Sequence, residues 1–185
     1  MRHSRLAFSL QAAGEDLGQI KHIQHLQCLK FTQVRGIQAL LGELRLEYQD
    51  DNACARGAYE LVAADGEAMV SLLATGSEVS IAVAARNNLQ SAGIPARVVS
   101  MPCWELFEEQ DEGYRRETLG QGTVRIGIEA AISMGWDRYV GENGGFIGMP
   151  GFGASAPAKD LYKHFGITAE AVVEMAKEKL AAQKG

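Results

Sequence analysis

The sequence predicts an α/β protein, in which helices cover a mostly parallel sheet. From about residue 57 onward, short apolar runs alternate with amphipathic stretches, which is typical of strands that alternate with helices along a chain. The length of 185 residues fits one domain with a short appendage. With 46% hydrophobic and 22% charged residues, the chain has the composition of a globular protein with a substantial core.

Composition and charge exclude several other classes. No stretch approaches the roughly 18 consecutive apolar residues of a transmembrane helix. The net charge of −5 argues against a broad basic surface for nucleic acid. Cys28, Cys54 and Cys103 form no CxxC pair, so neither a disulfide framework nor a zinc site is predicted. This odd, widely spaced set of cysteines and the lack of a legible secretory signal in Met1–Leu17 lead us to expect a cytoplasmic protein.

The first regular part of the chain predicts a strand–helix–strand unit. Its expected elements are a strand at Gly57–Ala63, a turn at Asp65-Gly66, a strand at Met69–Ala74, a helix carrying the stripe Val79, Val83, Ala84 and Leu89 and ending at Gly93, and a strand at Ala96–Met101. Gly93 suits the residue that follows a helix, because glycine adopts a left-handed conformation freely. The last two strands should run parallel through a right-handed crossover.

A second round of elements follows the same alternation. We expect a short helix after the loop Pro102–Phe107, an amphipathic helix at Glu112–Leu119, a strand at Thr123–Glu129, a helix at Ala130–Tyr139 weakened by Gly135, a short strand at Gly145–Met149, and two closing helices at Pro157–Phe165 and Thr168–Ala182. Thr168 is the expected N-cap of the last helix.

Residues 1–44 differ from the rest of the chain. They hold five lysines and arginines against three acidic residues, a net charge of +2, so the remainder carries −7. They show no clear strand pattern, and we expect them to be weakly structured or helical and to pack less firmly than the domain that follows. His22 and His25 could share a helix face as metal ligands, but no residue is spaced to complete such a site, and a solvated or partner-facing role is favoured.

The turn at Gly76 and Ser77 is a candidate anion site, because a strand, a glycine turn and a helix N-terminus meet there and the helix directs free N–H groups outward. Ser77 could cap that helix. Glu78 places a negative charge where a phosphate would lie, so a simple helix cap is the favoured interpretation.

Other candidates for chemistry each have a structural interpretation that we favour. Glu129 ends a predicted strand, where α/β folds present functional groups, and Asp137 is the nearest acid, but a capping or loop-anchoring hydrogen bond is commoner there. His164 lies near a helix end that suits a cation. Cys103 would be a nucleophile only with a base close by, and packing is its favoured role. We therefore assign no catalytic, metal-binding or cofactor-binding residue.

Two aromatic residues are expected to be structural or to form an interface. Trp136 should be largely buried. Phe152 lies in Gly148–Pro157, whose glycines and prolines impose a particular loop path, and we expect it to be a loop anchor or a contact with another subunit.

Four motifs resemble one known family in order and spacing. These are LLATGSEVSIAVAA (Leu72–Ala85), RVVSMPCWELFEEQ (Arg97–Gln110), IEAAISMGWDRYVG (Ile128–Gly141) and GFGASAPAKDLYKHFGIT (Gly151–Thr168), and they are similar to the C-terminal domain of bacterial transketolase. The similarity begins near Leu44–Tyr48 and covers roughly three quarters of the chain, so residues 45–185 are expected to form this domain. The resemblance implies a three-layer sandwich whose sheet has five strands, one of them, at Cys54–Tyr59, antiparallel at the edge.

The resemblance also implies what this chain lacks. Transketolases transfer two-carbon ketol units between sugar phosphates in the pentose phosphate pathway, and they bind thiamine diphosphate with Mg²⁺ or Ca²⁺ in two domains that precede this one. The motifs of those domains are absent from the sequence. The family's arginine motif before this domain is also absent, and Arg35 cannot be assigned its role, so residues 1–44 look like an unrelated segment.

Our hypothesis is a C-terminal domain or fragment of a transketolase that supports the dimer and is inactive alone. Its expected partners are the missing transketolase domains or a second copy, and neither nucleic acid nor a membrane. Two alternatives remain open from the sequence: a regulatory module that binds a small anion at Gly76 and Ser77, and the C-domain of a related thiamine enzyme such as a pyruvate dehydrogenase β subunit.

Overall fold

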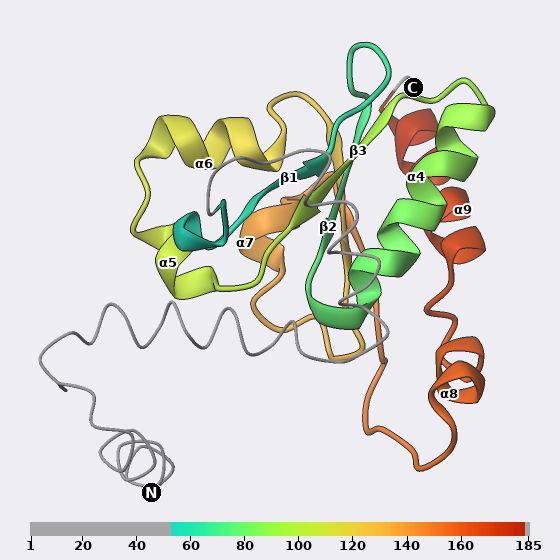
Figure 1. Ribbon diagram of the computed structural model, residues 1–185. Coiled ribbons are helices and arrows are strands. Elements are labelled where there is room, and N and C mark those ends of the chain that lie inside the picture. Colours follow the sequence, from blue (N-terminus) through green and yellow to red (C-terminus); the bar gives the residue numbers. More distant parts are fainter. Residues whose placement is uncertain (1–52, 184–185) are drawn as a thin grey trace, which may run out of the picture.

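A computed structural model describes residues 53–183 of the chain (Figure 1). Its strands are β1 (Tyr59–Val62), β2 (Val70–Ala74), β3 (Ala96–Ser100), β4 (Val124–Ile128) and β5 (Gly145–Ile147). Its helices are η1 (Ala53–Arg56), η2 (Gly76–Glu78), α4 (Val79–Ser91), α5 (Trp104–Glu108), α6 (Glu112–Leu119), α7 (Asp137–Val140), α8 (Ala158–His164) and α9 (Ala169–Ala182). None of the helices described is long and apolar enough to cross a membrane.

The five strands form one sheet in the order β1-β3-β2-β4-β5. β1 pairs antiparallel with β3, and the other neighbouring pairs are parallel. The predicted architecture, a mostly parallel five-stranded sheet with one antiparallel edge strand, is confirmed. Leu72 of β2 stands opposite Val98 of β3 and Ile126 of β4, which places apolar side chains in register across the centre of the sheet.

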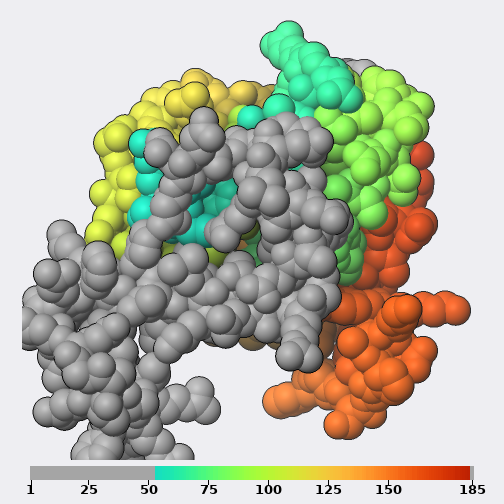
Figure 2. Space-filling model, viewed as in Figure 1, coloured from blue at the N-terminus to red at the C-terminus, as the bar shows by residue number. Residues whose placement is uncertain are grey.

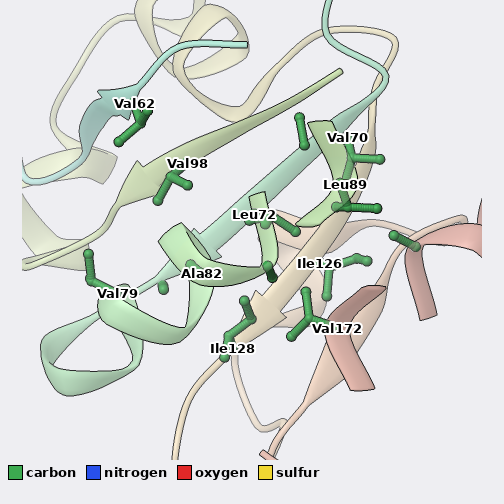
Figure 3. Packing of buried hydrophobic residues seen from close by; sticks show 14 of the residues in the cluster. Val62, Val70, Leu72, Val79, Ala82, Leu89, Val98, Ile126, Ile128 and Val172 are labelled. Atoms are coloured by element: carbon green, nitrogen blue, oxygen red, sulfur yellow. The ribbon is translucent and has the colours of Figure 1, made fainter. Parts of the chain in front are cut away.

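Helices cover both faces of the sheet (Figure 1). α4 and α9 pack together over one face, where Leu72, Val98 and Ile126 form a buried apolar cluster with side chains of both helices (Figure 3). α5, α6 and α7 lie on the other side, where the neighbouring strand residues Leu73 and Val99 form a second cluster. Because β2 is buried on both faces, its sequence is mostly apolar, and its one polar residue, Ser71, is buried and lies 2.8 Å from the hydroxyl of Thr123.

The ends of the predicted helices are largely confirmed. Gly93 follows α4 with φ +75°, and the amide of Ile94 donates to the carbonyl of Leu89 at 2.9 Å, closing the helix end. Thr168 caps α9 by accepting a hydrogen bond from the amide of Ala171 at 3.3 Å.

The edge strand begins later than the family resemblance suggested. Residues 53–56 form the 3₁₀ helix η1, and the strand starts at Tyr59. Gly57 turns between them with φ +80°, its carbonyl accepting from the amide of Cys103 at 3.0 Å. This close approach to the start of α5 holds the chain outside the sheet until residue 59.

The predicted helix at 130–139 is mostly wrong, since only Asp137–Val140 is helical. The carbonyl of Ala131 accepts from the amide of Met149 at 2.9 Å, and the amide of Glu129 donates to the carbonyl of Ile147 at 3.1 Å. The backbone after β4 therefore continues to pair with the backbone after β5. Gly135, at φ +90°, also departs from helical geometry.

The boundary expected near residue 45, the histidines His22 and His25, and Arg35 all lie outside the described residues.

Candidate functional site

The carboxyl ends of the parallel strands define the edge where α/β folds present functional groups. Gly76 and Ser77 follow β2, Glu129 follows β4, and the segment 148–157, exposed from residue 150 on, follows β5. The sheet therefore places these sequence candidates along one edge.

Ser77 does not cap the helix that follows it. The N-cap of α4 is Glu78, without a side-chain capping bond, because the 3₁₀ turn η2 precedes α4. The Ser77 hydroxyl instead donates to Oε1 of Glu78 at 2.9 Å and lies 2.8 Å from the hydroxyl of Tyr162. The Ser77 hydroxyl, which was expected to cap the helix, therefore contacts the side chains of Glu78 and Tyr162 instead.

Glu78 and Tyr162 form a contact that the sequence did not reveal. Tyr162, on α8, donates a hydrogen bond to Oε1 of Glu78, which is 5% exposed. Burial, together with this carboxylate, raises the pKa of Tyr162. Ser77, Glu78 and Tyr162 thus form a polar cluster that ties α8 to the start of α4 and places a carboxylate beside the Gly76 turn.

Glu129 anchors a loop, as predicted. Nε1 of Trp136 donates to its Oε2 at 2.5 Å, and the Trp136 ring is completely buried. That ring makes an edge contact with Trp104 at 5.2 Å between centroids and lies 5.7 Å from the ring of Phe146. The expected burial of Trp136 is confirmed, and this carboxylate is occupied by an internal donor.

The remaining candidates, Cys103, His164 and Asp137, have structural surroundings in the described part of the chain. Cys103 lies 3.5 Å from a carboxylate oxygen of Glu105, and burial raises the pKa of its thiol, which disfavours the nucleophilic thiolate. His164 ends α8 against the ring of Phe165. Asp137 begins α7. Within residues 53–183, no group of three or more histidine, cysteine or acidic side chains could hold a metal ion.

Two neighbouring loops at this edge expose large apolar side chains. Ile132 is 46% exposed, Met134 78% and Phe152 fully exposed. The loop that carries Ile132 and Met134 is joined to the segment before Phe152 by the hydrogen bond between Ala131 and Met149. We call Ile132, Met134 and Phe152 the apolar loop surface. The sequence pattern singles out only Phe152 of these three, because Ile132 and Met134 fall within the predicted helix at 130–139.

Residues 150–160 are exposed throughout, and Figures 1 and 2 show this segment and α8 extending from the body of the domain. Phe152 is therefore not a packed anchor within the described part of the chain, and its role as a subunit contact stays a prediction.

The fold is that of an α/β sandwich domain, and the carboxylates Glu78 and Glu129 at its sheet edge bind internal donors. The family model of the transketolase-like TK C-terminal domain matches residues 57–168. The chain therefore belongs to the transketolase C-terminal domain family.

Known transketolases share this part of the sequence. The transketolase of Sinorhizobium medicae is 59% identical over 138 residues, which cover 74% of this chain and 20% of that protein. The chloroplastic transketolase of Solanum tuberosum is 52% identical over 110 residues, covering 59% and 15%. The chain thus spans about a fifth of the length of the curated relatives it matches.

Solved structures show the same fold. A transketolase from Leishmania mexicana matches with a TM-score of 0.61 at 46% identity, over 66% of this chain and 18% of that one. A Pichia stipitis transketolase, solved in complex with sedoheptulose 7-phosphate, matches with a TM-score of 0.65 at 38% identity, over 71% and 19%. Neither the anion-binding module nor the C-domain of another thiamine enzyme is favoured by these matches.

The family in general uses thiamine diphosphate and a divalent metal, and the Gly76 turn does not fit that pair. A diphosphate requires donors and cationic groups. The Gly76 turn offers instead the buried Glu78 carboxylate, with the Ser77 hydroxyl already engaged.

Proposed function

We propose that this chain serves as the C-terminal domain of a ketol-transferring transketolase, where it supports assembly of the dimer without binding the cofactor itself. The activity would belong to the pentose phosphate pathway. Thiamine diphosphate, with Mg²⁺ or Ca²⁺, would be bound by the preceding domains that the relatives carry. Residues 45–185 would form the domain, preceded by the non-matching segment 1–44.

The apolar loop surface carries this proposal. Monomeric proteins expose single apolar side chains commonly, but neighbouring ones on ordered loops mark interaction sites. Ile132, Met134 and Phe152 all lie within the matched range 57–168, so the surface belongs to the family domain. Covering it with the other transketolase domains, or with a second copy, would remove these side chains from water.

The cytoplasm is the location that goes with this role. Within the described residues Cys103 is a free thiol, and free thiols persist in a reducing compartment.

Three measurements test the proposal. Calorimetry should detect no binding of thiamine diphosphate with Mg²⁺ to the purified chain, and no ketol transfer should occur. The chain should associate with the separately expressed preceding domains of the Sinorhizobium medicae transketolase, measured by analytical ultracentrifugation. Phe152→Ser should weaken that association about tenfold or more, as expected for a buried aromatic contact.

Lys159→Ser is the matched control, because Lys159 is exposed on the same segment. It should leave association within about twofold of the original chain, an energy below about 0.5 kcal/mol. Tight, metal-dependent cofactor binding to this chain alone, or equal effects of the two substitutions, would contradict the proposal.

A further inference from the structure

A charged hollow lies on the side of the sheet opposite α4 and α9. It is formed by α5, α6, α7 and the start of β4, and its volume is about 400 Å³, which lies within the range of small-molecule sites. We call it the arginine pocket. Its charged lining residues are Glu108, Glu112, Arg115, Arg116, Arg125 and Arg138.

The charge of the arginine pocket opposes that of the whole protein. Four arginines and two glutamates give its lining a formal charge of +2, whereas the chain carries −5. Glu108 pairs with Arg115 at 2.8 Å and with Arg138 at 3.7 Å. Glu112 pairs with Arg116 at 3.5 Å. Both carboxylates are thus already held by arginines, and the excess positive charge remains.

Arg125 is the arginine that lacks a carboxylate partner within the described residues. It is half-buried, and it donates to the carbonyl oxygens of Gly120 at 3.3 Å and Tyr139 at 3.2 Å. Burial lowers the pKa of Arg125, because desolvation disfavours the charged form. Neutral carbonyls compensate a partly desolvated guanidinium less well than an anion does.

Tyr139 contributes a buried hydroxyl to the lining. Its side chain is 2% exposed, and its hydroxyl makes no hydrogen bond of good geometry within residues 53–183. Burial, and then the nearby Glu108, raise the pKa of Tyr139, so the hydroxyl stays protonated and remains a donor at neutral pH. This donor lies beside the Glu108 carboxylate, which already binds Arg115 and Arg138.

We propose that the arginine pocket binds the phosphate group of a small phosphorylated molecule. A phosphate monoester carries between about 1.5 and 2 negative charges at pH 7, which matches the +2 of the lining. Arginine forks match phosphate oxygens bidentately, and Arg125, whose acceptors are neutral carbonyl oxygens, is the arginine of the lining without an anionic partner. This site lies apart from the Gly76 turn and does not rest on the proposed function.

Binding can be followed through the two tryptophans of the chain, Trp104 and Trp136. The ring of Tyr139 lies 5.1 Å from that of Trp104 and 6.2 Å from that of Trp136. Inorganic phosphate and ribose 5-phosphate would be titrated into the full chain, with ribose and with sodium chloride of equal ionic strength as controls. We expect a saturable change in tryptophan fluorescence with both phosphates and none with ribose or chloride.

Substitutions identify the binding groups. Arg125→Gln should weaken phosphate binding about tenfold or more, the loss expected for a charge-assisted hydrogen bond. Arg138→Gln, at a residue whose side chain is 61% exposed, should weaken it without affecting the fold. Lys177→Gln is the matched control, because it removes one positive charge on α9 away from the pocket.

The two phosphate probes distinguish the source of the ligand. Tighter binding of ribose 5-phosphate than of inorganic phosphate would indicate that the pocket also contacts the attached molecule, and equal binding would indicate a site for the phosphate alone. Absence of saturable binding, equal weakening by Lys177→Gln and Arg138→Gln, or a response to an acidic peptide but not to phosphate would overturn the proposal.

Discussion

Replacement of Trp136 by alanine should be among the most destabilising single changes in the domain. The ring is completely buried and contacts Trp104 and Phe146. A β-carbon built on Gly127 of β4 would lie 2.8 Å from the Trp136 ring, which shows how closely the ring packs on the sheet. Removing a buried tryptophan costs about 3 to 5 kcal/mol, through lost apolar burial and the cavity left behind.

The hydrogen bond to Glu129 adds less to this loss. Glu129 is half-buried, so water can replace the indole donor after the substitution. Trp136→Phe keeps most of the apolar burial and loses the donor, and we expect it to cost roughly half as much as Trp136→Ala.

Chemical denaturation followed by circular dichroism measures these free energies of unfolding, with the slope of the transition as a check on cooperativity. Met134→Ala is the matched control, because Met134 precedes Trp136 by two residues but is 78% exposed. It should change stability by less than about 0.5 kcal/mol. Similar losses of unfolding free energy for Trp136→Ala and Met134→Ala would refute the inference that burial of the Trp136 ring stabilises the domain.

Three further outcomes follow from individual contacts. Gly57→Ala should prevent stable folding, measured by thermal melting, because its β-carbon would lie 2.3 Å from backbone atoms of residues 103–107 and the φ of +80° disfavours alanine. Tyr162→Phe should lower stability by about 1 to 3 kcal/mol in denaturant titrations, because buried Glu78 loses a donor. The raised pKa of Tyr139 means that the unfolded chain loses this phenolic proton first, so stability should fall as pH rises above about 10, and less steeply in Tyr139→Phe.

The elements that the sequence predicted well are those whose burial is visible in their composition. β2 and β3 are mostly apolar because both faces of the sheet are covered, and α9 combines a threonine cap with a regular apolar stripe. Residues 130–136 were predicted as helix because alanine, isoleucine and methionine favour one. Their backbone instead pairs with the segment after β5, through the bond from Met149 to Ala131, and local propensity carries no information on such pairing.

The candidate site was less predictable, because its contacts join distant residues. Tyr162 and Glu78 lie 84 positions apart, and no pattern near either residue indicates the hydrogen bond. The same holds for the arginine pocket, where Arg125 enters from a strand and Arg138 from a short helix. The sequence positions of these residues give no sign that they share a hollow.

The carboxylates at the edge of the sheet bear on where function can lie in this domain. Glu78 and Glu129 occupy places from which α/β enzymes present catalytic groups. Here Tyr162 and Ser77 bind the first, and the indole of Trp136 binds the second, so each carboxylate fastens a neighbouring element to the sheet. Tyr162 lies on α8, which follows the loop that exposes Phe152. Trp136 ends the loop that exposes Ile132 and Met134. Acidic groups at this edge therefore hold the loops in place, and the apolar side chains on those loops are what the edge offers to a partner.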